Sequence, residues 1–391
     1  MRIAVVCSDL GIRVPGPKGA SLHLQAITRA LAETGHDVML VAVAGHGDPP
    51  ARLHSVLLPH PGRTTGLRRE ARKLRFCAAL PRRVAGALDA FAPEVVYERL
   101  SLFGTAGRRI ALAHGVPHVV EVNALLAREE SQWRGLRMGA LARRREREVL
   151  AGATLRVAVS EEVAAAVRAV APGPPTLVVP NGVDARALAC LPARAAAREA
   201  LGLPGDAFIT GFAGALRPWH GVGTAIDALA AMPPPHHLAI AGDGPLRAEM
   251  TRRAEALGVA GRLSWLGQLE HGRMPGFLAA LDVAVAPYPA LEGFSFSPLK
   301  VFEYLAAGVP TVASDIGQLR PLLSGGRGQL VPPGDPRALA EACERVRRDP
   351  GPWRERARIA REDVLAAHSW DDRARMIIDG LQEVSADAVA A

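Results

Sequence analysis

The sequence predicts an α/β protein built from two doubly wound domains. Short apolar runs alternate with amphipathic stretches along almost the whole chain, in two successive series. A break rich in Pro and Gly at residues 172–175 separates the series. The 391 residues are also too many for one ordinary core and suit two domains of nearly equal size.

The first series predicts buried parallel strands, because its short runs are hydrophobic throughout, as a sheet covered on both faces requires. These strands lie at residues 3–7, 38–43, 95–97, 119–122 and 155–159. Helical patterns occupy residues 21–33, 67–91, 103–114, 126–151 and 161–171. A strand at 176–179 and a turn at 180–184 follow.

The second series begins after a helix-like segment at residues 193–201. Its strands are predicted at 208–212, 238–241, 263–266, 283–286, 311–313 and 330–332. Helices at 336–348, 353–367 and 370–384 end the chain, and Pro336 suits a first helical position. Two β/α series predict two Rossmann-like domains with a cleft between them.

Composition narrows the class of protein. The four cysteines are scattered, which argues against a zinc site or a disulfide scaffold. The N-terminus runs directly into the first strand, and no apolar run approaches the ~20 residues that span a bilayer. We expect a cytoplasmic protein, with peripheral contact at the inner face of the membrane as an alternative.

The net charge of +8 comes almost entirely from arginine, since the only lysines are Lys18, Lys73 and Lys300. Two clusters of arginines lie within residues 68–83 and 143–147. Solvated helix faces explain them, and an anionic membrane or acidic acceptor is the alternative. Nucleic acid is disfavoured, because no aromatic residues interleave with these arginines.

Ligands of open parallel sheets bind at the carboxyl ends of the strands. After the first strand, a glycine-containing loop carries Lys18, Gly19 and His23 into a helix whose N-terminus suits an anion. The alternative is that this loop binds no ligand. His23 is a lone histidine, and it can equally lack a functional role. Glu121 and Asn123 follow another strand, where sugar contact and structural hydrogen bonding both remain open.

The second half carries more of the expected chemistry. Gly214, Arg217 and His220 follow the strand at 208–212 and suit a diphosphate, because a glycine turn, a guanidinium and a helix N-terminus meet there. Gly242 and Asp243 follow the next strand. Asp243 is a candidate donor-site residue, and capping the helix that starts near residue 245 is its structural alternative.

The segment 292–308 is the most informative. Ser295 and Ser297 precede a helix that opens at Pro298 and offers free amides to a phosphate. One turn into this helix, Glu303 is placed to accept hydrogen bonds from the two hydroxyls of a ribose. Lys300 and Glu303 share a helix face, so a plain helical ion pair is the alternative.

Together these stretches resemble the retaining family-4 glycosyltransferases, which have the GT-B fold, over nearly the whole chain. The resemblance rests on the order and spacing of five motifs, at residues 18–23, 179–184, 242–245, 303–308 and 369–370. The last resembles the start of the C-terminal helix that crosses back onto the first domain in this family. The resemblance implies an acceptor-side domain at 1–183, with 370–391 packing on it, and a donor-binding domain at 184–369.

The resemblance also implies roles for single residues. Glu303 would hold the donor ribose, Arg217 would neutralise the leaving diphosphate, and the backbone around Ser297, Pro298 and Leu299 would line the phosphate. Asn123 stands where many members carry a histidine that touches the donor sugar.

Two departures from the family pattern affect the donor site. Ala215 and His220 occupy the usual Arg and Lys positions, and Arg217 replaces the lost charge. The common pattern pairs two glutamates eight positions apart, but Ser295 stands eight residues before Glu303. Glu292 is the candidate substitute.

These features predict a glycosyltransferase that moves a sugar from a UDP- or GDP-sugar to an unidentified acceptor with retention, in glycan, glycolipid or secondary-metabolite biosynthesis. Arg217, Lys300 and Asn123 are the predicted catalytic residues. Donor binding is predicted for Gly19, Gly214, Arg217, His220, Gly242, Asp243, Ser297, Pro298, Leu299 and Glu303. The substrate or acceptor is predicted to contact Lys18, His23, Glu121, Glu292 and Ser295.

We expect no cofactor and no metal, because the sequence contains no Asp-x-Asp. The expected partners are the nucleotide-sugar donor, the acceptor and, as an alternative, an anionic membrane. A catalytically degenerate sugar-nucleotide-binding subunit and a nucleotide-sugar epimerase of the same shape remain alternatives. A nicotinamide-dependent oxidoreductase is disfavoured, because no GxGxxG follows a strand.

Overall fold

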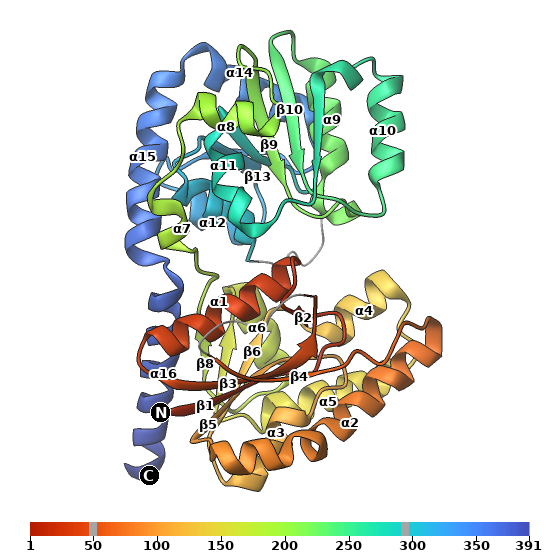
Figure 1. The fold of residues 1–391 in the computed structure, drawn as a ribbon, viewed down its shortest axis with the longest axis vertical. Helices are drawn as coiled ribbons and strands as arrows, with labels where there is room; N and C mark the ends of the chain where they lie inside the picture. The colour runs from red at the N-terminus through yellow and green to blue at the C-terminus, as the bar shows by residue number, and fades with distance from the viewer. Residues whose placement is uncertain (47–52, 291–296, 391) are drawn as a thin grey trace. The chain divides into compact units, whose positions relative to one another are not determined.

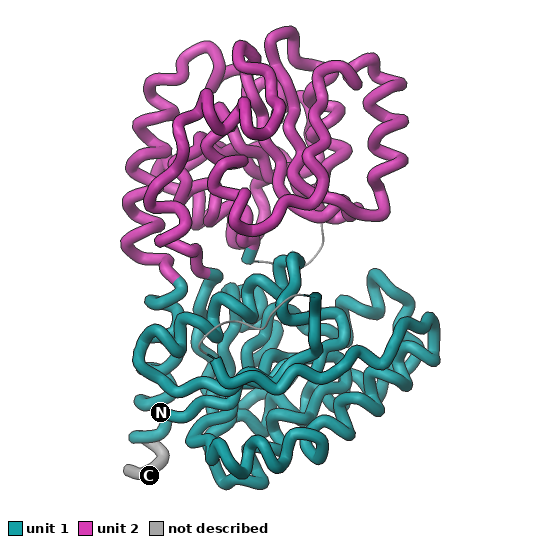
Figure 2. The backbone as a smooth tube through the Cα atoms, viewed as in Figure 1, with its two compact units in different colours: residues 1–181, 295–297, 370–391 teal, residues 182–294, 298–369 magenta. Residues whose placement is uncertain are grey.

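The computed structural model describes residues 1–46, 53–290 and 297–390, and the chain folds into two compact units (Figures 1 and 2). Unit 1 comprises Met1–Asn181, Ser295–Ser297 and Trp370–Ala391, and unit 2 comprises Gly182–Phe294 and Pro298–Ser369. Each unit contains one parallel sheet with helices around it, which confirms the predicted α/β class with two parallel-sheet domains.

The sheet of unit 1 has the strand order β2-β3-β1-β5-β6-β7-β8, with β4 paired to β3. Its strands are β1 (Arg2–Cys7), β2 (Arg13–Val14), β3 (Asp37–Ala44), β4 (His54–Leu58), β5 (Val95–Arg99), β6 (His118–Val122), β7 (Leu155–Ala158) and β8 (Thr176–Val178). Its helices are α1 (Gly19–Glu33), α2 (Gly66–Phe91), α3 (Ala106–His114), α4 (Leu126–Arg134), α5 (Gly139–Ala151), α6 (Glu161–Val170) and α16 (Trp370–Ala390).

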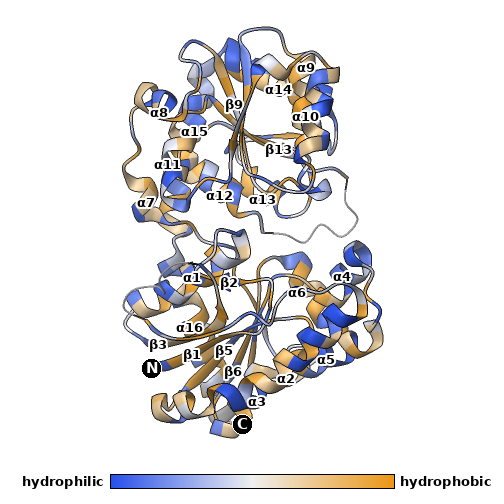
Figure 3. Ribbon diagram, turned by 45° about the vertical axis from the view of Figure 1, so that its right-hand side comes forward, coloured by the Kyte–Doolittle hydropathy of each residue, from blue (hydrophilic) through white to orange (hydrophobic). Residues whose placement is uncertain are grey.

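Alternate residues of β1 point to opposite faces of this sheet, and each face has its own core. Val5 packs in one core with residues of α1 and α16, including Leu24 and Ile377. Val6 packs in the other core with residues of α2 and α3, including Leu80. Helix α16 therefore completes the core of unit 1, as predicted for the C-terminal helix, and Figure 3 shows the apolar strands inside the helices.

Unit 1 differs from the prediction in two places. The helix predicted at residues 126–151 is two helices, because Gly135 has a φ of +62° and ends α4 in the left-handed conformation. The prediction also missed β2 and β4. Strand β2 has two residues, too few for a periodic pattern, and β4 is only partly buried.

The sheet of unit 2 has the order β11-β10-β9-β12-β13-β14. Its strands are β9 (Phe208–Ala213), β10 (His236–Ala241), β11 (Leu263–Gly267), β12 (Val283–Ala286), β13 (Thr311–Ser314) and β14 (Gln329–Val331). Its α-helices are α7 (Ala185–Ala189), α8 (Arg194–Leu201), α9 (Val222–Ala231), α10 (Arg247–Ala256), α11 (Met274–Ala279), α12 (Leu299–Ala306), α13 (Leu319–Leu323), α14 (Pro336–Arg348) and α15 (Pro350–Ala367). Three 3₁₀ turns are η1 (Pro218–His220), η2 (Ala260–Arg262) and η3 (His271–Arg273).

Two helix starts in unit 2 test the predicted caps. Pro336 is the first residue of α14, as predicted, and the Asp335 carboxylate caps this helix by accepting from two backbone amides. Asp243 does not cap α10, because that helix begins at Arg247 with Leu246 at its N-cap. The Asp243 carboxylate instead accepts from the amide of Gly244, at 2.7 Å.

Two neighbouring glycines in unit 2 allow a matched test of backbone constraint. Gly221 has a φ of +71°, and a Cβ added there would lie 1.7 Å from the carbonyl oxygen of Pro287. Gly223 in α9 would contact only the Met250 sulfur, at 3.6 Å. We expect Gly221→Ala to lower the free energy of unfolding by about 2 kcal/mol or more, through left-handed strain and steric overlap.

Gly223→Ala is the control, expected to leave stability unchanged or to raise it by up to about 1 kcal/mol. Urea unfolding of both variants, followed by tryptophan fluorescence, makes the comparison. Equal midpoints for the two variants would contradict the expected constraint at Gly221.

Candidate functional site

In unit 2, two glycine turns and the start of α12 come together at the carboxyl ends of β9 and β10. Gly214 follows β9 with a φ of +142°, and a Cβ added there would lie 2.8 Å from Lys300 Nζ. Gly242 follows β10 with a φ of +157°, and its added Cβ would lie 1.9 Å from the Gly214 carbonyl oxygen. Two predicted donor-binding residues, Gly214 and Gly242, therefore lie together with Lys300, which was predicted to be catalytic. A Cβ at Gly242 would overlap the backbone, and one at Gly214 would crowd the end of the Lys300 side chain.

The ammonium group of Lys300 is buried against aromatic rings. Its Nζ lies 4.3 Å from the ring centroid of Phe212 and 5.3 Å from that of Tyr288. Among the described residues it has no hydrogen-bond partner. Burial lowers the pKa of Lys300 to about 7, against the opposing charge of Glu303. A buried donor without an acceptor is uncommon in proteins, so this ammonium is available to an anionic ligand.

Glu303 lies one turn further along α12, close to the same ammonium. Burial raises the pKa of Glu303 to about 7, which the charge of Lys300 opposes and that of Asp184 reinforces. Neither Lys300 nor Glu303 forms an ion pair within 4.0 Å with any residue in the described ranges. The plain helical ion pair, the structural alternative for these two residues, is therefore not formed.

His220 and Arg217 flank the Gly214 turn and differ in charge. His220 Nδ1 lies 2.6 Å from the Ala215 carbonyl oxygen, which can only accept, so Nδ1 carries the proton. Burial and the nearby charge of Lys300 lower the pKa of His220 to about 3, so the ring is neutral with its lone pair on Nε2. The Arg217 side chain is exposed, 5.8 Å from the ring centroid of Trp219. Arg217 thus provides positive charge where His220 does not.

The segment before α12 is divided between the two units. Helix α12 begins at Leu299, and its N-cap Pro298 provides no side-chain cap. Ser297 belongs to unit 1, where its Oγ accepts from the Asn181 amide at 3.1 Å and its carbonyl accepts from the Asn181 side chain. Glu292 and Ser295, also predicted as substrate contacts, lie outside the described residues.

Sequence reasoning missed the tyrosines of the site. The Tyr304 hydroxyl accepts a hydrogen bond from the Ala213 amide at 2.8 Å and so ties α12 to the end of β9. Tyr288 contributes a ring to the Lys300 pocket. The chain has only three tyrosines, and the third, Tyr97, hydrogen bonds to Glu121. The rarity of tyrosine in this chain is the signal that could have pointed to Tyr288 and Tyr304, as the rarity of lysine pointed to Lys300.

In unit 1, Glu121 lies at the centre of a buried network and is 1% exposed. Its carboxylate lies 2.6 Å from His23 Nε2 and accepts from Arg99 Nη1 at 2.8 Å and from the Tyr97 hydroxyl at 2.7 Å. The Asn123 amide also donates to it. Burial alone would raise the pKa of Glu121, but the charges of His23 and Arg99 outweigh burial, and the pKa lies below its usual range.

The other nitrogen of His23 is also engaged. Its Nδ1 lies 2.7 Å from Asn181 Oδ1, and its ring meets Trp370 edge-on with centroids 4.9 Å apart. These contacts favour structural hydrogen bonding for Glu121 and His23 over direct substrate contact. Lys18 and Gly19 lie at the start of α1, where Lys18 is the N-cap without a side-chain cap bond.

Two kinds of feature are absent from the described residues. No group of three or more His, Cys, Asp or Glu residues there is arranged to hold a metal ion. No helix in those ranges has the length and apolar character that crossing a membrane requires.

Comparison with known proteins gives matches over both units. The protein-family model described as Glycosyltransferase Family 4 matches residues 17–187. The family model described as Glycosyl transferases group 1 matches residues 207–349. The chain is 32% identical over 180 residues to the lipopolysaccharide core biosynthesis mannosyltransferase LpsB of Rhizobium meliloti, which covers 43% of this chain and about half (50%) of that protein. It is 28% identical to the glycogen synthase of Mycobacterium tuberculosis, over 95% of this chain and 92% of that protein.

Solved structures match the whole fold. The sucrose-phosphate synthase of Thermosynechococcus elongatus aligns with a TM-score of 0.82 and 22% identity, over 99% of this chain and 100% of that one. Anabaena Alr3699/HepE in complex with UDP-glucose aligns with a TM-score of 0.73 and 20% identity, over 98% and 100%. At these identities the likeness concerns the fold.

The network around Glu121 generates a prediction that separates structure from substrate contact. Glu121→Gln leaves His23 and Arg99 without their anionic partner in a buried site, so we expect stability to fall by about 3 kcal/mol. Glu161→Gln removes an exposed carboxylate 3.6 Å from Arg168 and is expected to change stability by less than about 1 kcal/mol. Thermal unfolding measures both. Unchanged stability in Glu121→Gln would contradict the structural role.

Proposed function

The chain belongs to family 4 of the glycosyltransferases and has the GT-B fold, and on this premise we propose that it is a hexosyltransferase that uses a nucleotide-diphosphate sugar. The donor is a UDP- or GDP-sugar, and the sugar passes to an acceptor hydroxyl with retention of configuration. The observation that carries this proposal is the buried Lys300 ammonium, which has no hydrogen-bond partner among the described residues and lies against the Gly214 turn.

The diphosphate is assigned to the Gly214 turn and the start of α12. Lys300 and Arg217 supply positive charge, and the free backbone amides of Leu299 and Lys300 donate hydrogen bonds at the helix N-terminus. Gly214 and Gly242 let the backbone approach the ligand, because neither turn carries a side chain. His220 is neutral, so we assign it a hydrogen bond to the donor through Nε2 instead of charge compensation.

The ribose is assigned to Glu303, whose carboxyl group makes no ion pair with described residues and is close enough to Lys300 for each to shift the pKa of the other. The names of similar proteins support a nucleotide-sugar donor. Alr3699/HepE has been solved with UDP and with UDP-glucose, and two of the similar sequences are named a mannosyltransferase and a glycogen synthase. Asp243 and Gly19 remain predicted contacts of the donor, and Lys18 remains a predicted contact of the substrate or acceptor.

Catalysis in this proposal rests on stabilising the leaving group. As the bond between the sugar and the diphosphate breaks, negative charge grows on the diphosphate beside Lys300 and Arg217, and the sugar becomes oxocarbenium-like. The acceptor hydroxyl attacks from the face that the diphosphate leaves, and the leaving phosphate takes its proton, which gives retention. We propose that no metal takes part, on the ground that the sequence lacks Asp-x-Asp.

The acceptor is proposed as a glycan, a lipid-linked intermediate or a small metabolite, and the cellular site as the cytoplasm. One sequence feature favours a noncatalytic sugar-nucleotide-binding subunit as the second candidate. Ser295 stands where family members carry the first glutamate of the pair, which contacts the donor sugar. Nucleotide release that depends on an acceptor separates the two functions, since a binding subunit releases none.

A thermal-shift screen against UDP, GDP, ADP, dTDP and CMP tests the donor site. We expect one diphosphate of uridine or guanosine to raise the melting temperature, because a ligand that binds only the folded state stabilises it by about 2.7 kcal/mol at a hundredfold excess over Kd. Glu303→Ala should abolish this shift. Glu341→Ala removes an exposed carboxylate of α14 and is the control that should retain it. No change in melting temperature with any of these nucleotides at millimolar concentration would contradict the proposed donor site.

The position of Lys300 also predicts a pH dependence. Its lowered pKa of about 7 means that the unliganded protein loses the ammonium charge as the pH rises above neutrality. At pH 6 we expect the nucleotide diphosphate to bind the wild type roughly tenfold to a hundredfold more tightly than Lys300→Gln, as for a hydrogen bond to a charged group. Calorimetric titration at several pH values should show this ratio falling toward one by pH 9. A ratio that does not change with pH would contradict the role of the Lys300 charge.

A further inference from the structure

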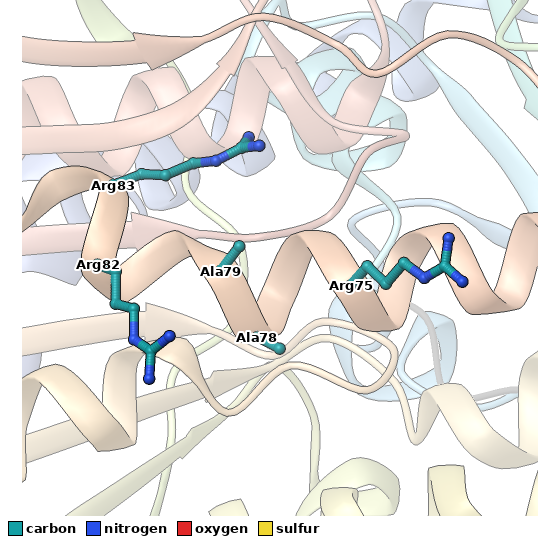
Figure 4. Close-up of a pocket in the computed structure, with 5 residues that line it drawn as sticks. All are labelled: Arg75, Ala78, Ala79, Arg82 and Arg83. Carbon is teal, nitrogen blue, oxygen red and sulfur yellow. The ribbon is translucent and has the colours of Figure 1, made fainter.

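The outer side of helix α2 carries a hollow edged by arginines. Arg75, Arg82 and Arg83 line it with Ala78 and Ala79, and its volume is about 420 Å³. Figure 4 shows Arg75 toward one end of this stretch and Arg82 and Arg83 at the other, with the two alanines between them. The spacing of seven and eight residues brings these arginines to one side of the helix, two turns apart. We call these five residues the arginine face.

Five of the seven positive charges of α2 fall into two groups. Arg69 and Lys73 form ion pairs with Glu130, at 2.8 and 3.2 Å, and that glutamate is buried. The three arginines of the arginine face are exposed and have no hydrogen bond or ion pair with any residue in the described ranges. Arg69 and Lys73 are therefore neutralised within unit 1, and the three arginines of the arginine face are not.

Acidic residues do little to offset the charge of α2. The helix contains seven Arg or Lys residues and two acids, Glu70 and Asp89. Glu70 is fully buried and accepts from the backbone amides of Arg137 and Met138, so it does not face the hollow. Asp89 lies near the end of α2, with its carboxylate 3.8 Å from His114 Nε2.

The neighbouring helices extend the positive surface. Arg109 of α3 donates to the Ala78 carbonyl at 3.0 Å and so places a further guanidinium next to the hollow. On α5, three exposed arginines have no acidic partner among the described residues, and these are Arg143, Arg144 and Arg147. Glu148 of the same helix is paired with Arg108 and Arg145. Leu67 and Leu112, on α2 and α3, are 50% and 66% exposed.

We propose that the arginine face docks unit 1 on an anionic lipid bilayer. Guanidinium groups bind phosphates in bidentate geometry, and each Lys or Arg near an anionic membrane surface contributes to attraction. Exposed leucines on α2 and α3 offer apolar contact at the headgroup boundary. The hollow is lined by arginines and alanines, with no aromatic ring on which a nucleic-acid base could stack. This proposal concerns unit 1 alone and does not depend on the donor site of unit 2.

The test is cosedimentation of the full chain with vesicles. One set contains phosphatidylcholine alone, and the other contains phosphatidylcholine with 30% phosphatidylglycerol by design, at low salt. The variant Arg75→Gln/Arg82→Gln/Arg83→Gln removes three charges from the arginine face. The control Arg252→Gln/Arg337→Gln/Arg345→Gln removes three exposed charges from unit 2, so both variants reduce the net charge from +8 to +5 (8 − 3). Circular dichroism checks that both variants fold.

We expect the wild type and the control to bind the anionic vesicles and not the neutral ones, and the arginine-face variant to bind the anionic vesicles at least tenfold more weakly. Raising the salt concentration should weaken the remaining binding. Equal binding to both kinds of vesicle, or equal loss in the two variants, would overturn the proposal. Binding of single-stranded RNA that depends on the arginine face, without binding to vesicles, would also overturn it and indicate a nucleic-acid surface.

Discussion

The Lys300 ammonium lies buried against two aromatic rings and two glycine turns, and its position constrains every segment around it. A Cβ on Gly214, which has a φ of +142°, would lie 2.8 Å from Nζ and displace it, and a Cβ on Gly242 would overlap the Gly214 carbonyl oxygen. Tyr304 fixes α12 to the end of β9, so the helix that carries Lys300 cannot move away from the turn. Burial and the charge of Lys300 together lower the pKa of His220, and the same charge opposes the burial that raises the pKa of Glu303. Burial and one cation without a hydrogen-bond partner among the described residues thus act together on the geometry and the protonation of this cluster.

The buried charges of the two units differ in their hydrogen-bond partners. In unit 1, Glu121 receives four donors from its own unit, and nothing about it calls for a ligand. In unit 2, Lys300 is as well removed from water but has no acceptor in the described part of the chain. Polar residues at the ends of buried strands look alike in a sequence. Their hydrogen-bond partners separate those that hold the fold together from those that are left without a partner in the described residues, for which we propose a ligand.

The fold was predictable because its signals are local. Parallel strands that are buried on both faces give continuous apolar runs, and both sheets were found from them, whereas the two-residue β2 leaves no such run. The cluster around Lys300 was predictable in part, since Lys300 is one of three lysines and follows a serine-containing loop. The partners of Glu121 were not predictable, because His23 lies 98 residues away along the chain and only the folded sheet brings the two together.

Helix α16 has a consequence for how the chain is made. Helix α16 contributes Ala374, Ile377, Ile378 and Leu381 to the core that α1 and β1 begin, so unit 1 takes one of its helices from a segment that follows unit 2 in the chain. During synthesis the ribosome must release all of unit 2 before that core can close. Until then, the apolar face of α1 and of the nascent sheet is uncovered, and unit 2 can fold first although it is encoded second. The order of translation and the order of folding therefore need not agree in this protein.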